Sequence, residues 1–151
     1  RDYDGLFTAR QVPEKGARVL QQAFVDTDYR IYYAAGIPYH GMPKLYNRAK
    51  IHFTPSLDTP SWREQFMPYT NLEALLCGCK IVASNSKSMA EWLVPAPGSA
   101  IVPQNDPGAT RHAAEEFLRD WQVNIEGMEW ARKHFSCQAV AEKLDKIFRS
   151  L

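Results

Sequence analysis

The feature that most constrains the fold is an alternation of short apolar runs with segments of helical spacing. Runs rich in strand-forming residues cover 5–9, 29–36, 50–56, 80–84 and the start of 99–109. Segments with apolar residues at helical spacing lie between them, at 17–24, 41–49, 70–78 and 86–94. Short strands separated by helices form a parallel sheet that is covered on both faces. The sequence therefore predicts the α/β class with a single, doubly wound parallel sheet.

The C-terminal part of the chain is predicted to be helical, over 108–121, 124–135 and 136–151. The last segment has an apolar face, made by Val140, Leu144, Ile147, Phe148 and Leu151. The length of 151 residues suits one domain, and neither an internal repeat nor a linker divides it. We expect one domain over 1–151.

Composition excludes several classes of protein. A formal net charge of +1 gives no global field for a nucleic acid partner. No run of about twenty apolar residues is present, so no membrane span is expected. Three cysteines, with Cys77 and Cys79 on or beside an apolar helix, indicate a reducing compartment and a cytoplasmic location. The histidines have no ligand spacing, so we expect packing or surface roles for them and no bound metal.

The first candidate anion site follows the first strand. Arg10 and Lys15 lie five residues apart, across a loop that contains Pro13 and ends at Gly16. Two cations in this position could clamp a diphosphate, Arg by its planar fork and Lys as a point charge. The alternative is a solvated loop in which Glu14 pairs with a neighbour.

The second candidate anion site is the stretch 61–78. A helix that begins near Thr70, with Thr70 or Asn71 as its cap, would point free N–H groups at the carboxyl edge of the sheet, where ligands bind in such folds. Glu73 is either the acid of a capping box with Thr70 or an acceptor for ligand hydroxyls. Glu64 has no helical role, and is either a solvated surface acid or a site residue.

Common signatures of nucleotide binding and acyl transfer are absent. The sequence has no G-x-G-x-x-G after the first strand and no Walker loop. It also has no G-x-S-x-G elbow, which would be expected of a serine hydrolase of the α/β type. From the residues alone, the two anion sites remain the leading candidates.

Several segments, in order, resemble the C-terminal, donor-binding domain of family 4 glycosyltransferases, also called glycosyl transferases group 1. They are "FTARQVPEKGARVLQQAF", "YRIYYAAGIPYHGMPKLYNRAKIHFTPS", "SWREQFMPYTNLEALLCGCKIVASNS", "GSAIVPQNDPGA" and "HFSCQAVAEKLDKIF". The third is similar to the family's E-x7-E loop and helix. The resemblance covers nearly the whole chain and implies a Rossmann-like sheet, the C-terminal half of a GT-B glycosyltransferase.

The resemblance implies roles for residues that would bind a nucleoside diphosphate. Arg10 and Lys15 match the pair that neutralises the diphosphate of a nucleotide-sugar donor. Glu73 matches the second glutamate of the motif, which binds the ribose hydroxyls. Gly36 and Ile37 would lie near the base.

The resemblance also implies roles at the helix start and at the sugar. Backbone N–H groups of Tyr69, Thr70 and Asn71 would meet phosphate or sugar oxygens. Glu64 matches the first glutamate, which contacts the transferred sugar, and is the candidate catalytic residue. An oxocarbenium-like centre would be favoured by such a carboxylate. No cofactor is implied, because the cations and the helix dipole take the place of a metal.

The chain departs from the family pattern in two places at the site. Eight residues, not seven, separate Glu64 from Glu73, and Pro68 has no N–H to offer a phosphate. Lys87 and Ser88 stand where the family has two glycines. Lys87 either adds a phosphate contact or blocks the site.

Two further departures concern the fold and the completeness of the enzyme. Only 25–28 join the first helix to the second strand, where the family has another strand–helix unit, so the sheet should be one strand short. The N-terminal domain that binds the acceptor in the family is absent from these residues. A sugar, lipid or protein acceptor, and any peripheral attachment to a membrane, would depend on that missing domain.

The resemblance implies transfer of a sugar from a nucleotide-diphosphate sugar to an acceptor, with retention of configuration. Two alternatives stay open on the sequence. One is a non-catalytic nucleotide-sugar-binding module, which the departures would permit. The other is a doubly wound domain kept only for interaction.

Overall fold

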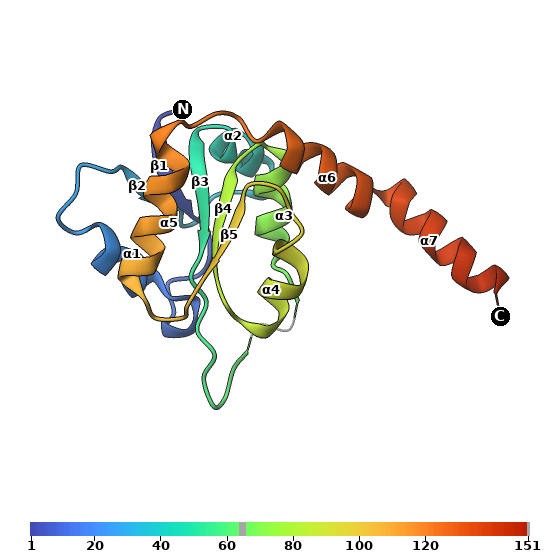
Figure 1. Ribbon diagram of the computed structural model, residues 1–151, viewed down its shortest axis with the longest axis horizontal. Coiled ribbons are helices and arrows are strands. Elements are labelled where there is room, and N and C mark those ends of the chain that lie inside the picture. The colour runs from blue at the N-terminus through green and yellow to red at the C-terminus, as the bar shows by residue number, and fades with distance from the viewer. Residues whose placement is uncertain (64–65, 151) are drawn as a thin grey trace.

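The sheet is parallel throughout and has the predicted doubly wound order. A computed structural model describes residues 1–63 and 66–150, with the backbone alone at 87 and 88. Its five strands have the order β2-β1-β3-β4-β5 (Figure 1). They are β1 (Tyr3–Phe7), β2 (Ile31–Tyr33), β3 (Ala49–Thr54), β4 (Lys80–Ser84) and β5 (Ser99–Val102). The loop after the first helix leads directly into β2, which confirms the expectation of a short sheet.

Helices cover both faces of this sheet. The α-helices are α1 (Ala17–Phe24), α2 (Met42–Tyr46), α3 (Tyr69–Leu76), α4 (Lys87–Leu93), α5 (Pro107–Arg119), α6 (Ile125–Phe135) and α7 (Cys137–Arg149), and 3₁₀ turns lie at η1 (Pro13–Lys15) and η2 (Tyr39–Gly41). Helices α1 and α5 pack together on one face, and α2, α3 and α6 lie on the other (Figure 1).

Alternation along the strands explains the two layers of core. Successive side chains of a strand point to opposite faces. Leu6 and Ile81 therefore join the buried cluster beneath α2, α3 and α6, while Phe7 and Val82 join the cluster beneath α1 and α5. In β3, His52 lies between Ile51 and Phe53, which both belong to the cluster beneath α1 and α5. Its side chain therefore points to the opposite face, toward α3, where it is 1% exposed. The expectation of a packing role is confirmed for this histidine.

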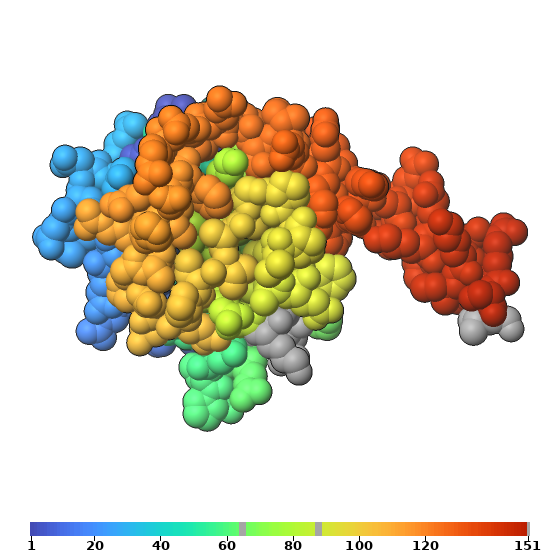
Figure 2. Space-filling model, in the orientation of Figure 1, coloured from blue at the N-terminus to red at the C-terminus, as the bar shows by residue number. Residues whose placement is uncertain are grey.

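Helix α7 is arranged differently from the other helices. It continues from α6 and extends away from the sheet (Figures 1 and 2). It contains no buried residue, and its predicted apolar face includes the exposed Val140, Leu144, Ile147 and Phe148. Leu151 lies outside the described residues. Among the described residues, no helix combines the length and the apolar character needed to cross a membrane.

The start of α3 corrects the sequence prediction. The sequence predicts Thr70 or Asn71 as the cap, and a capping box with Thr70 is one of the two roles that it allows for Glu73. Instead the helix begins at Tyr69, Pro68 occupies the N-cap position with φ −56° and ψ 135°, and no side chain caps it. Proline fixes its own φ and holds the residue before it in extended backbone, so it sets the boundary. Glu73 is consequently in the second turn, beyond the reach of a capping box.

Candidate functional site

A pocket opens where the order of the strands reverses. The chain leaves β1 toward β2 on one side and reaches β3 on the other, and ligands of doubly wound sheets bind at such a switch point. The switch-point pocket, about 200 Å³, lies at the carboxyl ends of β1 and β3. It is lined by Thr8, Ala9, Arg10, Lys15, His52, Phe53, Thr54, Pro68 and Thr70.

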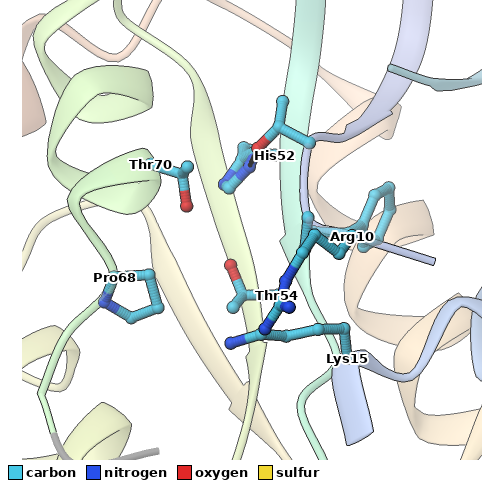
Figure 3. A pocket seen from close by; sticks show the side chains of 9 residues that line it. Arg10, Lys15, His52, Thr54, Pro68 and Thr70 are labelled. Atoms are coloured by element: carbon cyan, nitrogen blue, oxygen red, sulfur yellow. Dashed lines mark hydrogen bonds between the residues drawn. The ribbon is translucent and has the colours of Figure 1, made fainter. Parts of the chain in front are cut away.

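One wall of the switch-point pocket carries two cations. Arg10 lies in the exposed loop after β1, and Lys15 ends the 3₁₀ turn η1. Gly16 follows with φ 72°, and a Cβ there would lie 1.8 Å from the carbonyl oxygen of Pro55. Because only glycine permits this approach, η1 sits directly against the end of β3. Figure 3 shows Arg10 and Lys15 reaching into the pocket from the same side.

The opposite wall is the N-terminal end of α3. Pro68 and Thr70 line the pocket across from the two cations (Figure 3). The first-turn N–H groups of a helix lack partners within that helix and carry its positive dipole end. The N–H of Asn71, in contrast, donates to the carbonyl of Pro68 at 2.9 Å. Tyr69 is 82% exposed beside the pocket.

The floor is a buried hydrogen-bond network centred on His52. Its Nε2 lies 2.9 Å from Oγ1 of Thr8, and its Nδ1 lies 3.0 Å from Oδ1 of Asn71. The hydroxyl of Thr54 donates to the same amide oxygen. Burial lowers the pKa of His52 to about 4, so the ring is neutral at pH 7.

This network fixes the direction of the Thr8 hydroxyl. The amide oxygen of Asn71 accepts from the ring, while its Nδ2 points to the sulfur of Met89 at 3.5 Å. We therefore assign the proton of neutral His52 to Nδ1, which leaves Nε2 as an acceptor. In this tautomer Thr8 donates to Nε2, and its side chain also interacts with the phenol of Tyr46. The same bonds tie the ends of β1 and β3 to α3.

Two further hollows are present, and the first of them shares lining residues with the switch-point pocket. The β1–β2 hollow, about 380 Å³, shares the loop after β1 and adds the end of β2 as far as Gly36. The α3 hollow, about 440 Å³, is lined by Tyr39, Tyr69, Leu72, Glu73 and Leu76. Ile37 is partly buried against the core cluster beneath α3.

Glu73 is held in the α3 hollow by Tyr46. The phenol of Tyr46 donates to Oε2 of Glu73 at 3.0 Å. Burial, and in addition the Glu73 carboxylate, raises the pKa of Tyr46, so the phenol keeps its proton. A carboxylate fixed in this way still has free lone pairs toward the α3 hollow.

The structure brings most of the expected residues to one edge of the sheet. Arg10, Lys15 and Thr70 line one pocket. Gly36 shares the β1–β2 hollow with Arg10, whereas Tyr69 and Glu73 share the α3 hollow. Asn71 contributes a buried side chain beneath the pocket. Glu64 lies outside the described residues, and so do the side chains of Lys87 and Ser88.

Sequence reasoning missed Thr8, His52 and Trp62. Thr8 and His52 belong to the pocket itself, and the indole of Trp62 lies 4.4 Å from Nζ of Lys15. The available signal was a histidine at an inward-facing position of an apolar strand, between Ile51 and Phe53. Within the described residues, no cluster of His, Cys, Asp and Glu has the arrangement of a metal site.

Comparisons with known proteins bear on the family and the fold of the chain. The family model described as Glycosyl transferases group 1 matches residues 29–134. The chain superposes on sucrose-phosphate synthase from Thermosynechococcus elongatus with a TM-score of 0.79 and 18% identity, over 99% of this chain and 45% of that one. For HepE from Anabaena in complex with UDP-glucose the TM-score is 0.74 and the identity 17%, over 99% and 50% of the two chains.

A third solved structure is an isolated domain. The C-terminal domain of a group 1 glycosyl transferase from Francisella tularensis matches with a TM-score of 0.61 and 13% identity, over 85% of this chain and 82% of that one. The chain thus spans about half of the synthase and of HepE, and most of an isolated C-terminal domain. No match to a curated protein was found. These likenesses establish the fold as that of the C-terminal half of GT-B glycosyltransferases.

Proposed function

The chain belongs to the glycosyl transferases group 1 family, and on that premise we propose that it is the donor-binding half of a retaining glycosyltransferase. The donor would be a nucleotide-diphosphate sugar, bound without a metal. The observation that carries this proposal is the pairing of Arg10 and Lys15 with the N-terminal end of α3 across the switch-point pocket.

The diphosphate would lie between these two walls. Departure of a nucleoside diphosphate develops negative charge on its terminal phosphate oxygens as the bond to the sugar breaks. Arg10 can meet two oxygens through its fork, and Lys15 adds a point charge. The N–H groups of Tyr69 and Thr70, at the positive end of the helix dipole, face the same space. These fixed charges stabilise the leaving group in the transition state.

The nucleoside would extend from this pocket into the neighbouring hollows. The base would lie near Gly36, which lines the β1–β2 hollow, and near Ile37, the next residue along the chain. The ribose hydroxyls would donate to Glu73, whose carboxylate Tyr46 holds in place. HepE was solved with UDP-glucose, so UDP is the first nucleotide to test.

The sugar would be transferred next to the loop that carries Glu64. A carboxylate there would favour the oxocarbenium-like centre. Pro68 has no N–H, so the first backbone group of α3 that could donate to the ligand is the N–H of Tyr69. The N–H of Asn71 is already used by Pro68, and the Asn71 side chain would act from below through His52. An acceptor, whether sugar, lipid or protein, would be held by a second domain.

A second candidate function is binding without transfer. The observation in its favour is the longer spacing from Glu64 to Glu73, with Pro68 at the N-cap of α3. The extra residue changes where a first glutamate can lie relative to the diphosphate. Such a chain would bind nucleotide sugars and leave the glycosidic bond intact.

Calorimetric titration with UDP, GDP, ADP and their sugars tests both candidates. We expect one nucleotide series to bind, and Arg10→Ala or Lys15→Ala to weaken that binding below the range that calorimetry detects. Arg18→Ala is the matched control, because Arg18 is an exposed cation of α1 that does not line the pocket. If the wild-type chain binds none of these nucleotides, both candidates are wrong.

Transfer assays separate the enzyme from the module. The chain would be joined to, or mixed with, the acceptor-binding half of its own enzyme, and release of nucleoside diphosphate would be followed. Turnover that Glu64→Gln lowers by about a hundredfold or more would support the enzyme. Tight binding of the nucleotide sugar with no turnover would instead support the module.

A further inference from the structure

The loop between β3 and α3 is anchored at its base on two sides. The N–H of Leu57 donates to the carbonyl of Glu14 at 2.8 Å, which joins the loop to η1. Gln104 accepts from the N–H of Asp58 at 2.8 Å and donates to the Asp58 carboxylate at 3.1 Å and to the carbonyl of Asn85 at 2.9 Å. These bonds fix the loop to the connections that follow β1 and β5, and Gln104 is itself bonded to the connection that follows β4.

The tip of the same loop is a tight turn that ends at Trp62. The N–H of Thr59 donates to the carbonyl of Trp62 at 2.7 Å, and the N–H of Trp62 donates back at 3.3 Å. This pair forms an isolated antiparallel bridge. Because base and tip are both fixed, the indole has a defined position, half-buried over the Lys15 side chain.

The contact between Trp62 and Lys15 has the geometry of a cation–π interaction. Nζ of Lys15 lies 4.4 Å from the centroid of the indole, well inside the limit of about 6 Å. A lysine side chain has several rotatable bonds and loses that freedom when its ammonium is held by a phosphate. An aromatic ring that already restricts the ammonium reduces this entropic loss.

We propose that Trp62 is a positioning residue, which holds the Lys15 ammonium at the mouth of the switch-point pocket for the diphosphate of the donor. This inference rests on the proposed function, in which Lys15 binds that diphosphate. Trp62 itself would act through Lys15 and would make no contact with the phosphates.

The test is a graded series at Trp62, measured as the dissociation constant for UDP by calorimetry. Trp62→Leu keeps bulk and removes the π face, and should weaken UDP binding about three- to tenfold. Trp62→Phe keeps a weaker π face, so its dissociation constant for UDP should lie between those of Trp62→Leu and the wild type. Trp92→Ala is the control, because Trp92 lies in α4 and does not line the pocket. It should leave the affinity unchanged.

A double-mutant cycle with Lys15→Met distinguishes positioning from a structural role. If Trp62 acts through Lys15, Trp62→Leu should change UDP affinity by less than about twofold once Lys15 is methionine. Ligand-observed NMR measures the millimolar affinities that this background requires. Equal losses in both backgrounds, or wild-type affinity in Trp62→Leu, would overturn the inference while leaving nucleotide binding intact. Failure of the wild type to bind any nucleotide would overturn the proposed function first.

Discussion

The N-terminal end of α3 and helix α7 are held to the protein in opposite ways. At α3, Asn71 is fully buried and joins a network with His52 and Thr54. In α7 no residue is buried, and Phe148 is 70% exposed. The difference teaches that buried polar contacts are concentrated where the pocket is built, since a buried polar network demands fixed partners. An amphipathic helix at the end of the chain makes no such demand.

The largest effect is expected from Gly16→Ala. A Cβ at this position would meet the carbonyl oxygen of Pro55 at 1.8 Å, so η1 must move away from β3. We expect a loss of about 3 kcal/mol or more in the free energy of unfolding, measured by urea denaturation. Gly36→Ala is the matched control. Gly36 has a similar φ of 65° with nothing within 4 Å, so only the backbone cost of about 1 kcal/mol remains.

The next effect is expected from Asn71→Ala. The substitution leaves the ring N–H of His52 and the hydroxyl of Thr54 without their shared acceptor. Two unsatisfied buried donors should lower the free energy of unfolding by about 2 to 3 kcal/mol. UDP affinity should fall as well, because the end of α3 is then free to shift. A variant that keeps wild-type stability would show that the network does not order this region.

A smaller effect should appear on acidification. The folded pKa of His52, about 4, lies below its unfolded value of about 6.5. The unfolded chain therefore binds the proton more readily, and stability falls as pH drops from about 6.5 toward 4. Between pH 7 and pH 5 we expect this group to account for about 2 kcal/mol.

Urea denaturation at both pH values measures this loss, and His52→Gln isolates the contribution of the histidine. The variant should show a pH dependence that is smaller by the same amount. An unchanged pH dependence would mean that His52 is not held neutral in the folded protein.

The smallest effect is expected in α7. Leu144→Ala shortens a side chain that is 48% exposed. Because α7 has no buried residue, the substitution leaves no cavity in a core. We expect a change in the free energy of unfolding within about 0.5 kcal/mol and no change in UDP affinity. A loss comparable to that of Asn71→Ala would remove the contrast between the two regions.

The fold was predictable because it depends on patterns that are local in the sequence. Each strand is an apolar run bounded by polar or turn residues, and its type follows from that run alone. The same locality explains the loop that carries Arg10 and Lys15. The cations follow β1 directly, and Gly16 marks the turn that sets them against β3.

The errors and omissions have non-local causes. Thr70 and Glu73 have the spacing of a capping box, yet the N-cap is Pro68, two residues before Thr70. Asn71 looked like a cap, but its partner His52 is 19 residues away. The position of the loop that carries Trp62 depends on a bond between Asp58 and Gln104, 46 residues apart. The members of the pairs Asn71–His52 and Asp58–Gln104 are too far apart in the sequence for a local pattern to reveal that they are in contact.

The direction of the Thr8 hydroxyl gives the site a chemical polarity. With its proton directed to His52, Thr8 offers an acceptor to a ligand, while Arg10 and Lys15 offer donors from the wall. A hydroxyl or an N–H of a ligand that approached Thr8 would find an acceptor there. The crevice therefore has two chemically different sides, with hydrogen-bond donors on the wall that carries the cations and an acceptor at Thr8 on the floor.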